Sequence, residues 1–354
     1  MRTPSSPSRI EWPDAGRALQ FQRWLDGFDP DHAIDVATLR PASSDASFRR
    51  YLRADRRSGG SVVLMDAPPP HEDVRPFVRV AGLIAAADLN APRVLECDAV
   101  NGFLLLTDLG DEQYLGALQA AVARADDRRV QSLMADATAA LVRWQTGVAA
   151  DKLPPYDKAL LEREIDLFPE WCVVRHCGVG WSTEEAAVWQ NARERLVASA
   201  LSQPTVAVHR DYMPRNLMVS TPNPGILDFQ DAVRGPLSYD VASLLRDAFL
   251  SWDEEQEIDW AVRYWEAARR AGLPVDADFG DFWRALEWMG LQRHLKVLGI
   301  FCRLNYRDGK PAYIADLPRF FAYAHKVASR YSALRPLSRL LEPLMGAIRQ
   351  EAFY

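Results

Sequence analysis

The stretch from Val208 to Asp240 contains the residues best suited to chemistry. It has a His, an Asp and an Asn in VHRDYMPRNLMV and, in GILDFQD, Asp228 and Asp231. Asn216 lies five residues after Asp211, and Asp228 lies twelve residues after Asn216. A carboxylate and a carboxamide offer the oxygen ligands that Mg²⁺ prefers, and a second carboxylate can accept the proton of an attacking hydroxyl. These residue types indicate phosphoryl transfer, in which a protein chiefly positions nucleophile, phosphate and metal.

The order of these residues also matches a known signature. Residues 209–211 are HRD, Asn216 follows at the expected distance, and residues 228–229 are DF. This is the H-R-D-x-x-x-x-N and D-F-x pattern of kinase catalytic loops. The triplet HRD alone occurs often by chance, and a single Asp usually caps a turn. Three matches in the correct order favour the catalytic interpretation.

Short strands are predicted on both sides of this loop. The apolar runs PTVAV and NLMV are separated by seven residues, among which Pro214 blocks regular helix or sheet. A second turn, STPNPG, leads into ILDFQD. Two loops at one edge of a small sheet would bring the two Asp and the Asn together.

The first hundred residues predict a small antiparallel sheet. Apolar runs at 36–40, 48–52 and 62–65 are separated by turns rich in Ser, Asp and Gly. Two further strands are predicted in VLECDAVNGFLLL, joined by a hairpin turn at AVNG. Helices are predicted in RALQFQRWLDGF and from Val74 to Asp88.

Beyond Glu112 the apolar residues follow helical spacing. We therefore predict an α+β protein with a boundary in TDLGD, which gives a nucleotide-binding lobe of residues 1–107 and a helical lobe of residues 108–354. Only the segment around the catalytic motif interrupts the helices. They are predicted near 128–148, 157–176, 183–201, 238–249, 255–271, 279–303 and 313–350.

Composition limits the class of partner. The chain has 354 residues, of which 48% are hydrophobic, enough for two lobes with cores. A net charge of -6 argues against nucleic acid, and no apolar run approaches the roughly 18 residues of a membrane span. The four cysteines lack CxxC spacing, which favours packing roles for Cys172 and Cys177 in a reducing compartment. We expect a cytoplasmic, soluble protein with a small-molecule partner, no membrane association and no obligate protein partner.

On these motifs, from Leu39 to about Tyr331, the chain resembles the aminoglycoside phosphotransferase and choline kinase-like family. The resemblance implies a protein-kinase-like fold of two lobes, with ATP and Mg²⁺ as cofactors. Within the family, SSDASFRRY, LMDAPP and DFQDAVRGPLSYDVASLLRD are most similar to anomeric sugar kinases of cell-wall recycling. These enzymes phosphorylate the C1 hydroxyl of N-acetylmuramate and N-acetylglucosamine.

The resemblance also implies roles for single residues. It implies Asp211 as the catalytic base, His209 as a support of the loop and Arg215 as a group that neutralises phosphate charge. It implies Asn216 and Asp228 as the Mg²⁺ ligands.

One feature departs from the family pattern. Kinases of this fold usually have a lysine on the third strand, but no lysine precedes Lys152, and that strand is VVLMDAPP. The residues expected to replace it are Arg49, Arg50 and Arg53, because a guanidinium suits phosphate oxygens. Each of the three is as readily a solvated strand charge.

The remaining nucleotide contacts are expected in two places. A turn of backbone N–H groups and hydroxyls in SSDASF, including Ser44 and Ser47, would form an anion nest beside Arg49. The strand end LLLTDLG, with Leu106 and Thr107, is the expected hinge whose backbone pairs with an adenine.

Further residues are expected to support the site or bind the acceptor. Asp240 is expected to be the N-cap of VASLLRDAF, and Arg246 a paired structural arginine. Aromatic and polar residues on one helix suit a sugar, and an arginine there suits the lactyl carboxylate of N-acetylmuramate. These acceptor candidates are Trp283, Trp288, Arg293, His294 and Arg303.

Other functions remain open at this point. The acidic clusters SWDEEQEIDW and DADFGD would suit a cationic aminoglycoside, although such runs are usually solvated helix starts. Choline and homoserine are alternative acceptors. The missing lysine also allows a catalytically inactive nucleotide or sugar sensor, but a sensor needs no base, and Asp211 is present together with Asn216 and Asp228.

Overall fold

In the computed structural model the chain folds into two compact units, named here the sheet unit and the helical unit. The sheet unit comprises Met1–Glu112 and Met218–Asp231, and the helical unit comprises Gln113–Leu217 and Ala232–Tyr354. The structure describes residues 10, 12, 14–28, 30–44, 48–69 and 71–351. The functional division into lobes of residues 1–107 and 108–354 stays a prediction.

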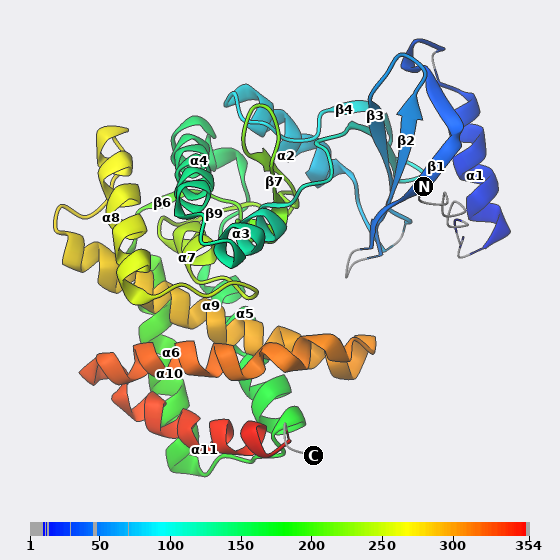
Figure 1. The fold of residues 1–354 in the computed structure, drawn as a ribbon. Coiled ribbons are helices and arrows are strands. Elements are labelled where there is room, and N and C mark those ends of the chain that lie inside the picture. The colour runs from blue at the N-terminus through cyan, green and yellow to red at the C-terminus, as the bar shows by residue number, and fades with distance from the viewer. Residues whose placement is uncertain are drawn as a thin grey trace. The chain divides into compact units, whose positions relative to one another are not determined.

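The sheet unit contains five antiparallel strands in the order β1-β2-β3-β5-β4 (Figure 1). Leu52, Leu64 and Leu105 are paired across the three central strands and face helix α1, whose Phe21 and Leu25 close this core. The predicted three-strand meander and the two further strands are therefore confirmed. The bounds are α1 (Ala15–Asp26), β1 (Ile34–Ser44), β2 (Arg50–Arg56), β3 (Ser61–Asp66), β4 (Val94–Asp98) and β5 (Phe103–Thr107), with a short 3₁₀ turn at Pro30–His32.

The second stretch of the sheet unit packs beside helix α2 (Arg75–Ala86). The backbone N–H of Ile226 donates to the carbonyl of Asn90 at 2.7 Å. The rings of Phe77 and Phe229 lie 4.6 Å apart between centroids. Residues far apart in the sequence thus share one core.

The small sheet expected to carry both catalytic loops is not formed. Strand β6 (Thr205–Val208) pairs with β9 (Val233–Pro236), whereas β7 (Leu217–Met218) pairs with β8 (Gly225–Ile226). The 3₁₀ turn at Pro214–Asn216 separates β6 from β7, and the STPNPG turn joins β7 directly to β8. Two separate two-stranded ladders replace the predicted sheet.

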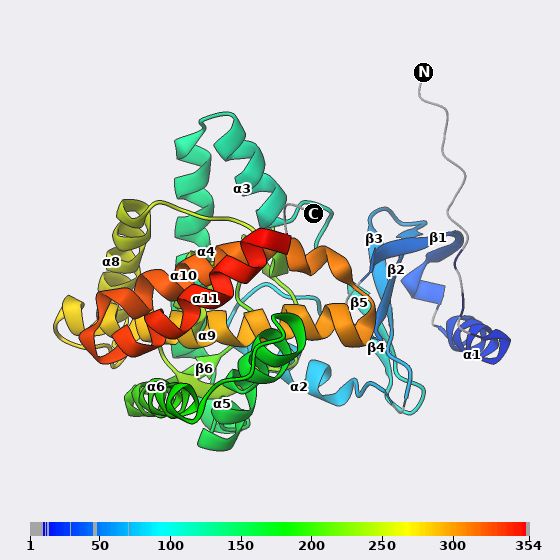
Figure 2. The ribbon, with the colours of Figure 1, turned by 90° about the horizontal axis from the view of Figure 1, so that it is seen from below.

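Helix α9 lies at the centre of the helical unit and packs against α6 and α10, and α10 in turn packs against α11 (Figure 2). Most predicted helices are confirmed, but α3 and β9 were not predicted. The 3₁₀ turns are at Ala150–Lys152, Pro311–Asp316 and Ser332–Leu334. The helices are α3 (Tyr114–Ala123), α4 (Asp127–Gly147), α5 (Lys158–Ile165), a π-helix (Phe168–His176), α6 (Thr183–Ser202), α7 (Tyr239–Leu245), α8 (Glu254–Arg270), α9 (Phe279–Asp308), α10 (Leu317–Arg330) and α11 (Arg335–Glu351).

Two further observations concern the described part of the chain. No helix in it is long and apolar enough to cross a membrane. All four cysteines are free thiols. Cys172 is buried as predicted, whereas Cys177 is only partly buried.

Candidate functional site

The loop that follows β6 is anchored by a buried carboxylate. The backbone N–H groups of His209 and Arg210 donate to Asp240 at 2.7 and 3.0 Å. Asp240 is fully buried in the first turn of α7, so its expected role as N-cap is wrong. Ser238 occupies the cap position, and the Asp240 side chain instead satisfies backbone donors of the loop.

Burial raises the pKa of Asp240 from 3.8 to about 7, although the two backbone hydrogen bonds act in the opposite direction. Arg210 has a positive φ of 77°, an uncommon conformation for a residue with a side chain. The hydrogen bonds to Asp240 hold the backbone in this conformation. The loop that presents Asp211 is therefore fixed by tertiary contacts.

Hydrogen bonds within the loop fix it further. The backbone N–H of Asp211 donates to His209 Nδ1 at 3.3 Å, and the Asn216 amide nitrogen donates to the Asp211 carbonyl at 2.9 Å. Tyr212 is fully buried, and its hydroxyl donates to the Ala137 carbonyl of α4 at 2.8 Å. None of these contacts uses the carboxylate of Asp211. The backbone is thus held while the side chain reaches a pocket.

The other predicted phosphate and metal residues lie near the same loop or in the sheet unit. Arg215 is in the 3₁₀ turn, with its guanidinium 5.3 Å from the centre of the Phe249 ring. Within the described residues no group of three His, Cys, Asp or Glu side chains could hold a metal. A metal bound here would therefore need an amide oxygen, such as that of Asn216, beside a carboxylate.

In the sheet unit, Asp228 has a positive φ of 60° and accepts a hydrogen bond from Gln230 at 2.9 Å. The Arg49 guanidinium lies 3.5 Å from Asp228 Oδ1 and 3.9 Å from Glu72 Oε2. Arg49 is largely buried, with 11% of its side chain exposed. It thus lies between a residue just before α2 and the predicted metal ligand. In protein kinases the third-strand lysine pairs with a glutamate of the αC helix.

The other two candidate arginines have structural partners. Asp66 is fully buried and binds both Arg17 of α1, at 2.9 Å, and Arg50 of β2. Arg50 and Asp66 each lie two residues along the strand from a leucine that faces α1, so they lie on the α1 side of the sheet. Arg53 binds Asp108 at 2.6 Å. The guanidinium of Arg49, by contrast, reaches the predicted metal ligand Asp228.

The other residues expected to contact the nucleotide are Ser44, Ser47, Leu106 and Thr107. Ser44 ends β1, and Ser47 lies outside the described residues. Leu106 is buried and paired within the sheet on both sides. The Thr107 N–H donates to the Arg93 carbonyl at 3.0 Å, and its hydroxyl accepts from the Arg93 N–H at 2.9 Å. Their nucleotide-binding roles stay predictions.

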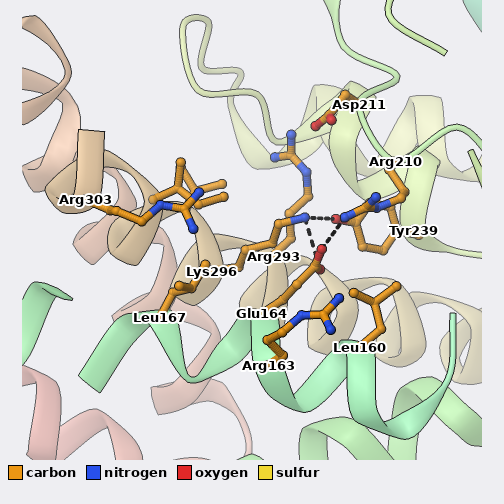
Figure 3. Close-up of a pocket in the computed structure, with 12 residues that line it drawn as sticks. Leu160, Arg163, Glu164, Leu167, Arg210, Asp211, Tyr239, Arg293, Lys296 and Arg303 are labelled. Atoms are coloured by element: carbon orange, nitrogen blue, oxygen red, sulfur yellow. Dashed lines mark hydrogen bonds and ion pairs between the residues drawn. The ribbon is translucent and has the colours of Figure 1, made fainter. Parts of the chain in front are cut away.

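A pocket of about 360 Å³ in the helical unit contains Asp211 (Figure 3). Five of its residues are basic and two are acidic, so its wall has a surplus of three positive charges. Helix α9 supplies Arg293, Lys296 and Arg303, which the sequence positions 293, 296 and 303 place on one helix face. The lining residues are Leu160, Arg163, Glu164, Leu167, Arg210, Asp211, Tyr239, Arg293, Lys296, Val297, Ile300 and Arg303.

Glu164 of α5 joins two of these cations (Figure 3). Its carboxylate accepts from Lys296 at 3.0 Å and from Arg210, and Lys296 also donates to the Tyr239 hydroxyl at 3.1 Å. Burial alone would raise the pKa of Glu164, but the charges of Lys296 and Arg210 outweigh it and lower the pKa from 4.5 to about 2. This network ties the HRD loop to α5 and α9.

Replacing Glu164 tests this network. Glu164→Gln is expected to lower the free energy of unfolding at pH 7 by about 3 kcal/mol, because Lys296 and Arg210 remain as buried charges without a counterion. The ionised Glu164 stabilises the fold above pH 4.5, and this contribution is lost as the pH falls toward about 2. Denaturant unfolding at pH 7 and pH 3 measures the effect.

The difference between the two proteins should be smaller at pH 3 than at pH 7. Glu162→Gln is the control, because Glu162 is a neighbouring, partly exposed residue of α5 paired with Arg193 at 3.0 Å. Its effect should stay below about 1 kcal/mol. Equal differences at both pH values would contradict the role of Glu164.

Two of the five residues expected to bind the acceptor line this pocket. Arg293 and Arg303 line the pocket, whereas Trp283 and Trp288 are not among its lining residues. His294 is also absent from the wall: it is fully buried, and burial lowers its pKa to about 3. Position 294 therefore turns to the core side of α9.

Arg246 is a paired structural arginine, as predicted, with Glu257 at 3.2 Å and Glu287 at 3.1 Å. Glu164 and Lys296 were not predicted as residues of the site. A signal for Lys296 existed, because it recurs at helical spacing with Arg293 and Arg303. Glu164 gave no comparable signal, since its partners lie 46 and 132 residues away.

Comparison with known proteins gives consistent results. Residues 38–283 match the model of the phosphotransferase enzyme family. An N-acetylmuramate/N-acetylglucosamine kinase of Pseudomonas aeruginosa is 50% identical over 94% of this chain and 98% of its own length. A protein with the same name from Neisseria meningitidis is 44% identical over 93% and 96%.

Solved structures show the fold. A choline/ethanolamine kinase family protein from Mesorhizobium loti superposes with a TM-score of 0.58 at 16% identity, over 94% of this chain and 99% of that chain. The GDP complex of aminoglycoside 2'-phosphotransferase-IIIa gives a TM-score of 0.59 at 13% identity, over 88% and 99%. The predicted kinase-like α+β fold is thereby confirmed.

Proposed function

The chain belongs to the phosphotransferase enzyme family and is a small-molecule kinase, and on this premise we propose that it phosphorylates the C1 hydroxyl of N-acetylmuramate and N-acetylglucosamine with ATP. Its relatives from Pseudomonas aeruginosa and Neisseria meningitidis are named for these two sugars. The observation that carries the proposal is the basic pocket at Asp211, with five cations against two carboxylates. Such a pocket attracts a negatively charged sugar and does not repel a neutral sugar.

The same pocket argues against the rival acceptors. Aminoglycosides carry several positive charges, and choline carries a quaternary ammonium, so a surplus of three positive charges would repel both. Homoserine has a carboxylate but also an ammonium group. A sensor without activity would have no use for a base held as firmly as Asp211.

In this reaction the carboxylate of Asp211 takes the proton of the C1 hydroxyl. The sugar oxygen then forms its bond to the γ-phosphorus, the bond from that phosphorus to the β–γ bridging oxygen breaks, and ADP leaves. His209, Asn216 and Asp240 hold the backbone around Asp211, so the base is oriented before the sugar binds.

We propose that Asn216 and Asp228 hold Mg²⁺, because an amide oxygen and a carboxylate are hard donors that suit this ion. When bound, the ion would offset negative charge on the phosphates. Arg215 is proposed to neutralise phosphate charge as well. The groups proposed for the nucleotide are Ser44, Ser47, Arg49, Leu106 and Thr107.

The proposal also has a cellular setting. The anomeric sugar kinases that the chain resembles act in the cytoplasm in cell-wall recycling. We therefore propose a cytoplasmic enzyme of peptidoglycan recycling.

The proposal can be tested by phosphorus NMR. The purified protein is incubated with Mg-ATP and, in separate tubes, with N-acetylmuramate, N-acetylglucosamine, kanamycin, choline and homoserine. A new sugar 1-phosphate signal is expected only with the two N-acetyl sugars, and Asp228→Ala should abolish it. Product only with kanamycin, choline or homoserine would replace the acceptor, and ATP binding without product in any tube would favour the sensor.

A further inference from the structure

The two proposed sugars differ in one group that the pocket can recognise. N-acetylmuramate carries a lactyl ether with a carboxylate on O3, and N-acetylglucosamine has a hydroxyl there. A site that distinguishes them needs a cation that is not already neutralised by the protein. The basic residues of the pocket differ in this respect.

Two of the cations already have carboxylate partners. Lys296 binds Glu164 at 3.0 Å and the Tyr239 hydroxyl at 3.1 Å, and Arg210 binds the same Glu164. Arg163 is on the exposed side of α5. Arg303 is only partly buried, although its Nε has no hydrogen-bond partner in the described structure.

Arg293 is different. Its side chain is buried, with 3% of the residue exposed, and Nη1 has no hydrogen-bond partner among the described residues. Within the described part of the chain, Nη2 donates a hydrogen bond to the sulfur of Met213 at 3.8 Å and to no oxygen, and a thioether is a weak acceptor. A buried guanidinium donor without an oxygen partner is costly, and here it lies on the wall of a pocket.

Nearby carboxylates do not supply that partner. Both oxygens of Asp240 accept from loop backbone N–H groups. Asp247 is fully buried, and one of its oxygens accepts from Ala248 at 2.6 Å while the other has no partner in the described structure. Burial raises the pKa of both acids, and the charge of Arg293 acts in the opposite direction. Neither acid binds Nη1.

Position along the helix selects Arg293 over Arg303. Figure 3 shows the guanidinium of Arg293 on the same side of the pocket as Asp211. Arg303 is ten residues further along α9, about 15 Å along the helix axis. In a pyranose only one ring atom separates C1 from C3, so a sugar with its C1 hydroxyl at Asp211 keeps its lactyl group near the same end of the pocket.

We infer that Arg293 binds the carboxylate of the acceptor and makes N-acetylmuramate the preferred sugar. This inference rests on the proposed function and deepens it, because it names the residue and the group that it recognises. Arg293 is a specificity residue, and the base Asp211 serves both sugars alike.

The test compares kcat/KM for the two sugars in the full chain. Arg293→Met is expected to lower kcat/KM for N-acetylmuramate by about 10- to 100-fold, the range for loss of one charge-assisted hydrogen bond, and for N-acetylglucosamine by less than about threefold. Arg284→Met is the matched control, because Arg284 is an exposed residue of the same helix, outside the pocket and paired with Asp281 at 3.0 Å, and it should change either value by less than about threefold. Thermal unfolding checks that both variants are folded.

A second measurement uses the unaltered protein. The methyl ester of N-acetylmuramate has nearly the same size but no charge, and it should be a poorer substrate than the acid by about tenfold or more. Equal losses with both sugars in Arg293→Met, or an ester as good as the acid, would overturn the inference alone. Absence of product from either sugar with the unaltered protein would overturn the proposed function together with it.

Discussion

Asp211→Asn is expected to lower kcat by about three orders of magnitude, within the range that a positioned general base contributes. The amide cannot accept the proton of the sugar hydroxyl. Because the loop hydrogen bonds of residue 211 use its backbone N–H and carbonyl, the variant should keep the loop conformation. Nucleotide affinity should therefore change by less than about twofold.

The measurement is the initial rate of ADP formation at saturating sugar and ATP, with nucleotide binding followed by titration. Asp259→Asn serves as control, because Asp259 is an exposed residue of α8 whose partner is Arg263 on the same helix. This control should have the normal rate. A normal rate in Asp211→Asn would contradict its role as the base.

Arg49→Gln is expected to lower kcat/KM for ATP by about 100- to 1,000-fold, the loss typical for one electrostatic group aimed at a reacting centre. Arg49 lies between Glu72 and Asp228, and no lysine precedes Lys152. Arg49→Lys should retain more activity, losing only about tenfold, because it keeps the charge without the planar fork.

The two Arg49 variants are measured at varied ATP with saturating sugar, and then at varied sugar with saturating ATP. The KM for the sugar should stay nearly constant. Arg79→Gln is a suitable control, because Arg79 is an exposed residue of α2 in the same unit. An unchanged kcat/KM for ATP in Arg49→Gln would show that another group replaces the missing lysine.

The elements of the sheet unit were predictable because their signals are local. Alternating apolar residues such as Leu52 and Leu64 indicate strands, and Gly and Asn mark their turns. These local signals do not predict which strand a very short strand pairs with. Strand β9 contains Gly235 and Pro236 within four residues, so it resembles a turn, and its pairing with β6 depends on the surrounding fold.

The site shows the same contrast. The motif residues were predictable from their spacing, and Arg293 was a candidate because it lies on a helix rich in Trp and Arg. The function of Asp240 was not predictable. An Asp at the start of a helix is usually a cap, but here the loop after β6 brings two backbone donors to its carboxylate. Glu164 escaped prediction because a buried ion pair between distant segments leaves no periodic pattern in the sequence.

The sheet unit is built from two separate stretches of the chain, and this has a consequence during protein synthesis. Its second stretch, Met218–Asp231, is made only after the whole of Gln113–Leu217. At about 5 to 20 residues per second a ribosome needs roughly 6 to 24 seconds to pass from residue 112 to residue 231. During that interval the nascent chain lacks Phe229 to cover Phe77 and Ile226 to bind Asn90. The residues around Asp228 are thus the last part of the sheet unit to be synthesised. The nascent chain therefore acquires this predicted metal ligand only when the sheet unit can complete its fold.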